Sequence, residues 1–125
     1  AVDVHYYLIR LADAFYKQRD KYTQCVDYTI KLCKRDIDLL PALFELKGCS
    51  NPLITRLCVI YEKQGKIEDA IELCDLAEKY GFTDNKFTPF SCRKIKLQKK
   101  LSATESNTWM QQYMQELRHN FMDTH

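Results

Sequence analysis

The stretch of sequence that decides the fold is residues 54–82, ITRLCVIYEKQGKIEDAIELCDLAEKYGF. Its apolar residues recur every three or four positions in two runs, which predicts amphipathic helices at about 52–64 and 67–80. Gly65 and Gly81 follow the two runs, and glycine readily adopts the left-handed conformation that ends a helix. The stretch therefore predicts two consecutive helices joined by a short turn.

Small side chains in this stretch indicate how the two helices pack. Cys58 in the first helix and Ala70 in the second are small, and Tyr61 lies one turn after Cys58. Small residues let two helices approach closely, and an aromatic ring fills the wedge beside them. We therefore expect an antiparallel helical hairpin with Cys58 and Ala70 packed beneath Tyr61.

A weaker copy of the same pattern precedes this hairpin. Residues 3–18 and 21–40 have helical periodicity, and small Ala12 and aromatic Phe15 are spaced like the corresponding pair of the second hairpin. Residues 37–50 form an insertion between the two copies. The N-terminal part therefore predicts a second antiparallel hairpin of the same kind.

The C-terminal part predicts two further helices, at about 89–101 and 104–122. Ser102 and Glu105 have the spacing of a capping box, which predicts a helix start between these two segments. Large apolar residues follow one side of the last helix: Trp109, Tyr113, Leu117 and Phe121. They predict core packing by a helix that caps the open end of the fold, or alternatively the seam of a homodimer.

Composition supports an all-α protein. The chain has 125 residues, 46% of them hydrophobic and 29% charged, which suits one soluble domain. Only three Gly and three Pro are present, which argues against an all-β protein with many tight turns. No apolar run is long enough to span a bilayer, so no membrane partner is expected.

The best hairpin resembles a divergent tetratricopeptide repeat (TPR). The residues that carry the resemblance lie in residues 54–82: Leu57, Cys58, Tyr61, Gly65, Ala70 and Ala77. The resemblance implies a single domain over residues 1–125, built as a stack of antiparallel helical hairpins. Its units would be about 3–40, 52–81 and 88–122, with about six helices including a terminal capping helix.

The TPR resemblance also implies a concave groove lined by the first helix of each hairpin. The expected peptide-binding residues are Arg10, Asp13, Lys17, Arg56, Lys63, Arg93 and Lys96. Because most of them are cations, the groove suits an acidic peptide, and Arg10, Arg56, Lys63 and Arg93 would set specificity. Four positions depart from the carboxylate clamp of chaperone-binding TPR proteins, which argues against chaperone tails as partners: Ile9, Asp13, Thr55 and Val59. We therefore expect a non-catalytic protein–protein interaction module.

The basic stretch 93–100 leaves a nucleic-acid-binding alternative open. Residues 84–101 carry six basic residues against Asp84 alone, a net charge of +5, although the net charge of the whole chain is only +2. Phosphates would favour such a stretch, but most charged helix faces are simply solvated. Binding of nucleic acid is therefore the less favoured interpretation.

The chain contains no motif for an enzymatic activity, a metal site or a cofactor. The six cysteines have no CxxC pair, and most occupy apolar helix positions where a thiol behaves as a small hydrophobe. Cys49 is the most plausible exposed thiol. No phosphate-binding, zinc-protease or serine-hydrolase motif is present. We therefore expect no catalytic site, no metal and no cofactor, and a reducing, cytoplasmic setting.

Overall fold

The protein is all-α. A computed structural model describes residues 1–123, with side chains described to residue 120. Within this range the chain has no β-strand, only an isolated parallel bridge between Ser50 and Thr83. Its five α-helices are α1 (Val2–Lys17), α2 (Gln24–Ile37), α3 (Pro52–Lys63), α4 (Ile67–Lys79) and α5 (Phe90–Asp123).

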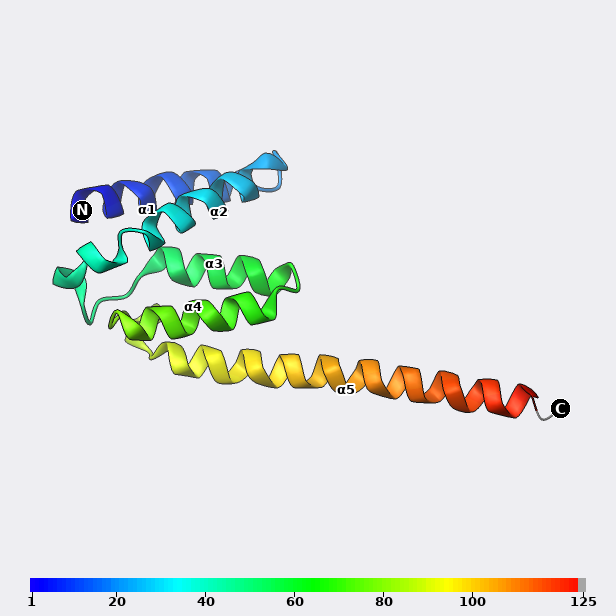
Figure 1. Cartoon of the computed structure of the whole chain (residues 1–125). Helices are drawn as coiled ribbons and strands as arrows, with labels where there is room; N and C mark the ends of the chain where they lie inside the picture. The colour runs from blue at the N-terminus through cyan, green and yellow to red at the C-terminus, as the bar shows by residue number, and fades with distance from the viewer. Residues whose placement is uncertain (124–125) are drawn as a thin grey trace.

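The helices follow one another as antiparallel neighbours. Figure 1 shows α1 and α2 as one pair, α3 and α4 as a second pair beside it, and the first half of α5 along α4. The second half of α5 extends beyond the other helices. The helix bounds agree closely with those expected for the first four helices, because each has a continuous apolar stripe at helical spacing.

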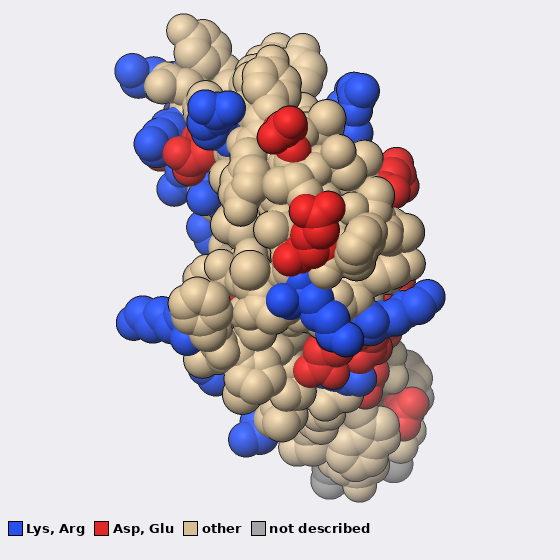
Figure 2. Space-filling view, turned by 90° about the vertical axis from the view of Figure 1, so that its left-hand side faces the viewer, with Lys and Arg blue, Asp and Glu red and all other residues tan. Residues whose placement is uncertain are grey.

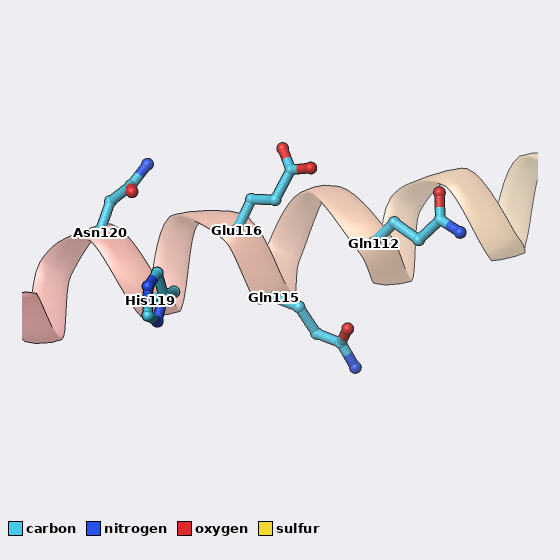
Figure 3. Close-up of a pocket in the computed structure, with 5 residues that line it drawn as sticks. All are labelled: Gln112, Gln115, Glu116, His119 and Asn120. Atoms are coloured by element: carbon cyan, nitrogen blue, oxygen red, sulfur yellow. The ribbon is translucent and has the colours of Figure 1, made fainter.

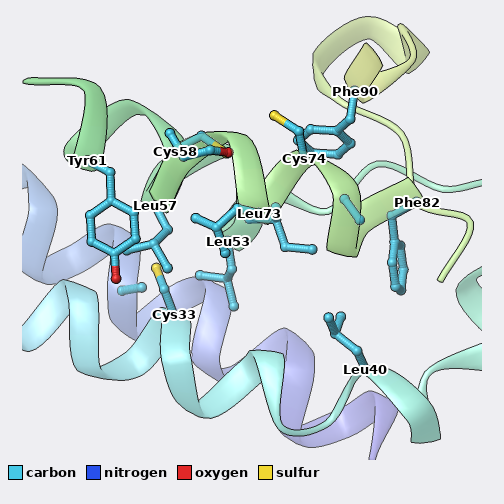
Figure 4. Close-up of a cluster of buried hydrophobic side chains, with 14 of the residues drawn as sticks. Cys33, Leu40, Leu53, Leu57, Cys58, Tyr61, Leu73, Cys74, Phe82 and Phe90 are labelled. Atoms are coloured by element: carbon cyan, nitrogen blue, oxygen red, sulfur yellow. The ribbon is translucent and has the colours of Figure 1, made fainter. Parts of the chain in front are cut away.

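The core contains the small residues that the sequence indicated. Ala12 and Cys58 are each 1% exposed, Ala70 is fully buried, and Tyr61 is 8% exposed. The Cys58 thiol lies 3.7 Å from the Ala70 carbonyl oxygen, toward which it donates. Figure 4 shows Leu57 and Tyr61 directed toward Cys33 of α2, and Cys74 beside Phe90 of α5. The predicted close approach of α3 and α4 is therefore confirmed.

The insertion between the two hairpins is compact. It contains two short 3-10 turns, η1 (Leu40–Ala42) and η2 (Phe44–Leu46), and buries Leu40 and Leu43. The buried Asn51 side chain then caps α3 by accepting hydrogen bonds from the N–H groups of Leu53 and Ile54 at 3.1 and 3.4 Å. Because a capped helix start needs no further partner for these N–H groups, α3 begins sharply at Pro52.

The C-terminal prediction was wrong. Residues 90–123 form one continuous helix, so no break occurs at Ser102 and the described chain has five α-helices rather than about six. The segment contains neither Gly nor Pro, and Thr104 and Thr108 donate their hydroxyls to carbonyl oxygens one turn earlier, at 3.0 Å each. A capping-box spacing without a helix breaker is therefore compatible with an uninterrupted helix.

The second half of α5 does not cap the fold either. Trp109, Tyr113 and Leu117, expected to pack in the core, are 61%, 47% and 40% exposed. The side chain of Phe121, which was grouped with them, lies outside the described side chains. The second half of α5 extends beyond α4, where no other helix of the described chain packs against it. This explains the exposure of these side chains.

A buried polar pair joins α1 to α2. His5 Nδ1 and Asp36 Oδ1 lie 2.6 Å apart, and both side chains are at most 2% exposed. The other carboxylate oxygen of Asp36 has no hydrogen-bond partner among the described residues. A buried carboxylate that lost its partner, or a histidine that lost its carboxylate, would retain the penalty of desolvation.

We expect Asp36→Ala to lower the free energy of unfolding by about 2–4 kcal/mol, because it leaves His5 buried without its partner. The matched control is Asp38→Ala, which removes an exposed carboxylate at the end of the same helix and is expected to change stability by less than about 0.5 kcal/mol. Urea unfolding of the two variants measures the difference. Equal losses would contradict a structural role for the pair.

Candidate peptide-binding groove

Three of the expected groove residues of the first two hairpins, Arg10, Asp13 and Arg56, lie together between α1 and α3. A cavity of about 160 Å³ opens there. It is lined by Ile9, Arg10, Ala12, Asp13, Pro52, Leu53 and Arg56. Its walls combine aliphatic side chains with a charged rim.

Tyr16 organises three cations beside this cavity. The guanidinium carbons of Arg19 and Arg56 each lie 4.1 Å from the centre of the Tyr16 ring. Lys63 Nζ lies 3.5 Å from the Tyr16 hydroxyl. Guanidinium groups over an aromatic ring are held in place without losing their charge, so this arrangement positions them for an anionic ligand.

Tyr16 itself lines a second cavity. Its volume is about 250 Å³, and it is lined by Tyr16, Arg19, Val26, Ile60, Lys63 and Gln64. Ile60 is buried, and Val26 and Tyr16 are half-buried. The apolar part of this cavity can therefore hold an aliphatic side chain while Arg19 and Lys63 face a neighbouring anion.

Asp13 reduces the positive charge of the groove. It pairs with Lys17 at 3.0 Å and with Arg56 at 3.4 Å. The hydrogen bond from Lys17 is the largest cause that holds the pKa of Asp13 below its ordinary value, with the charge of Arg56 contributing. Arg10 remains exposed at the rim, so the groove keeps a net positive charge.

Arg93, also expected in the groove, lies in a different environment. Its Nε donates to Asp84 Oδ2 at 2.6 Å, and Asp84, only 4% exposed, also accepts from the Thr55 hydroxyl at 2.8 Å. Burial alone raises the pKa of Asp84, but the hydrogen bonds from Arg93, Thr55 and the Asn85 N–H bring it below its ordinary value. Arg93 thus joins α5 to α3 through a compensated ion pair.

A third cavity lies beside this ion pair. It has a volume of about 260 Å³, and its lining includes Arg93, Lys96, Glu62 and the exposed Cys92. Lys96 is exposed at its edge. Of the two α5 residues that the sequence placed in the groove, Lys96 is therefore the one whose charge has no acidic partner among the described residues.

Three of the five basic residues in the stretch 93–100 form ion pairs within the chain. Besides Arg93, Lys94 pairs with Asp75 at 2.5 Å and Lys100 with Glu62 at 3.3 Å. Figure 2 shows Lys and Arg side chains along the left-hand edge of the molecule, while acidic and basic side chains mix across the centre and right. This pairing gives less support to phosphate binding by residues 93–100 than the sequence suggested.

The remaining cavities and thiols offer weaker sites. The residues in Figure 3, Gln112, Gln115, Glu116, His119 and Asn120, line a hollow on the surface of α5 alone, without a second wall from another described element. Burial raises the pKa of Cys33 to about 12, and a hydrogen bond with Cys74 together with burial raises that of Cys58. All six cysteines are free, Cys49 and Cys92 being the exposed ones.

No group of three or more metal-ligating side chains occurs among the described residues. Within the same range, no helix combines the length and apolar character needed to cross a membrane. Comparison of the chain with protein-family models, curated proteins and solved structures found no match.

Sequence reasoning missed Tyr16 and Arg19. The Asp13–Tyr16–Lys17 spacing places these side chains on neighbouring turns of one helix face, so Tyr16 could have been added to the expected groove. Arg19 follows the end of α1, and its Nη1 donates to the Tyr16 carbonyl oxygen at 2.9 Å. No helical spacing predicts this contact, because it depends on how the chain turns after Lys17.

We expect Asp84→Asn to lower the free energy of unfolding at pH 7 by about 1–3 kcal/mol, because the ionised carboxylate holds Arg93 and Thr55. The folded-state pKa of Asp84 is depressed, so its contribution is present above the unfolded pKa of about 3.9 and is lost as the pH falls through the folded value. The gap in the free energy of unfolding between wild type and variant should therefore shrink as the pH falls.

Urea unfolding at pH 7 and at about pH 3 measures this gap. The control is Asp75→Asn, which removes the exposed partner of Lys94 and should change stability little, since exposed ion pairs contribute little. A gap of the same size at both pH values would show that the charge of Asp84 does not stabilise the fold.

Proposed function

We propose that the protein is a non-catalytic protein–protein interaction module that binds an acidic, partly aliphatic peptide in the groove between α1 and α3. The observation that carries this proposal is the arrangement around Tyr16. The Tyr16 ring holds Arg56, which lines one cavity with apolar walls, and Arg19, which together with Tyr16 lines a second one. Apolar recesses supply affinity, and positioned cations supply charge selectivity.

The proposed architecture is TPR-like. Two successive antiparallel hairpins with small residues at Ala12, Cys58 and Ala70 support it, as does the turn at Gly65 with its positive φ of 78°. In such a stack the first helix of each hairpin presents its side chains on one face. Binding would then need no movement of the helices, only contact with side chains already in position.

The proposed setting is the reducing cytoplasm, with no cofactor and no chemical step. Free, mostly buried cysteines support it, because such thiols pack as small apolar groups. The buried His5 supports it too, since it is closed off against Asp36 instead of lining a cleft. A catalytic histidine needs contact with a substrate.

Selection from a display library of random peptides of about 12 residues tests the proposal. We expect the selected peptides to be enriched in Asp and Glu next to aliphatic residues. The double variant Arg10→Glu and Lys63→Glu should weaken binding of a selected peptide at least about tenfold, measured by fluorescence anisotropy, because it reverses two exposed charges at the groove.

The matched control is Lys31→Glu with Lys79→Glu, which changes the net charge equally on α2 and α4. It should leave affinity within about threefold of wild type at physiological salt. Selected peptides without acidic enrichment, or equal weakening by both double variants, would overturn the groove as the binding site. Tighter binding of a 20-nucleotide single strand than of any peptide, with steep salt dependence, would favour the nucleic-acid alternative.

A further inference from the structure

The apolar face of α5 changes side halfway along the helix. In the first half, Leu97 is 2% exposed and the half-buried Leu101 packs against the core one turn later. At 3.6 residues per turn, Met110, Met114 and Leu117 lie about 120–180° around the helix from that edge. The two halves of one continuous helix therefore present their apolar residues in nearly opposite directions.

The edge that continues from Leu101 becomes polar. The positions that follow it at helical spacing hold Thr104, Thr108, Gln112, Gln115 and His119. Figure 3 shows Gln112, Gln115 and His119 on this part of α5. The second half of the helix is thus not an extension of the core face, and the helices α1–α4 cannot cover its apolar side without a break in α5.

Five large side chains make up this second apolar face. They are Trp109, Met110, Tyr113, Met114 and Leu117, between 40% and 61% exposed. The rings of Trp109 and Tyr113 stack at a centroid distance of 5.5 Å and an interplanar angle of 4°. A contiguous exposed apolar stripe of this kind on a helix marks a surface that another helix covers.

We propose that the side of α5 that runs from Ser102 to Leu117 pairs with the same side of a second copy of the chain in an antiparallel orientation. The large residues Trp109 to Leu117 of each copy then lie opposite the small residues that precede them in the other copy. The exposed parts of the five side chains amount to about 500 Å², so two copies would bury about 1,000 Å² together, which is about the minimum area expected of a biological interface. A symmetric pairing is self-complementary, and the bodies of the two copies stay clear because each packs on the opposite side of its own α5.

Residue size favours the antiparallel orientation. The turns just before the stripe carry small residues on the same face: Ser102, Ala103 and Ser106. In an antiparallel pair, the small half of one helix lies opposite the large side chains of the other. Small residues opposite large ones allow close packing without voids.

Charge favours the same orientation. Lys96 and Lys99 are exposed on the side of α5 that continues the stripe toward its N-terminal half, and neither has an ion-pair partner within residues 1–120. A parallel pair would bring these lysines of both copies together, with mutual repulsion. An antiparallel pair places them far apart.

Sedimentation equilibrium of the whole chain between about 1 and 100 µM tests the pairing. We expect a monomer–dimer equilibrium, and Met114→Glu should raise the dimer dissociation constant at least about tenfold, since it places a charge in the apolar contact of both copies. The control Gln115→Glu adds the same charge at the next residue, which lies on the polar side of α5. It should change the dimer dissociation constant less than about threefold. A monomer throughout this range, or equal effects of both substitutions, would overturn the proposal.

Disulfide trapping tests the orientation. In a background with Cys49→Ser and Cys92→Ser, which removes the exposed thiols, the variants Ser106→Cys and Tyr113→Cys are oxidised alone and as a mixture. An antiparallel pair predicts a mixed disulfide between the two variants in excess over either homodimer. Preferential trapping of each variant with itself would show a parallel pair and overturn the orientation.

Discussion

Close contact between α3 and α4 at Cys58 and Ala70 is the constraint on which the rest of the structure depends. Both side chains are essentially excluded from water, and the Cys58 thiol reaches the backbone of Ala70. A larger side chain at either position would separate the helices, since cores at crystal-like density have no spare volume. The spacing between the two helices in turn sets where α5 packs against α4.

Charged and aromatic side chains, and not shape alone, define the candidate groove beside these helices. The Tyr16 ring faces guanidinium groups from two parts of the chain, Arg19 after α1 and Arg56 in α3. By contrast, Arg93 and Asp84 offset each other's charge. Together with Thr55 they join α5 to α3. Arginines on the same side of the molecule thus have different roles, set by whether a buried carboxylate is within reach.

Comparison of expected and observed elements shows where local patterns fail. The first four helices lie close to their expected bounds, because periodicity and terminal residues such as Asn51 and Gly65 act within one or two turns. The capping-box spacing of Ser102 and Glu105 was misleading, because without Gly or Pro the helix loses nothing by continuing. In a continuous helix, the rotation between Leu101 and Trp109 at 3.6 residues per turn fixes the side of α5 on which Trp109 lies.

The amino-acid sequence by itself determined the all-α class, the four helices of the two hairpins and the small residues at their contacts. These features depend on interactions between residues a few positions apart, or on side-chain size alone. Only the tertiary structure decided which cations are paired, that Tyr16 and Arg19 line a cavity beside Lys63, that His5 is buried against Asp36, and that the second apolar face of α5 is left uncovered. Each of these depends on distances between segments remote in the chain, which helical periodicity does not specify.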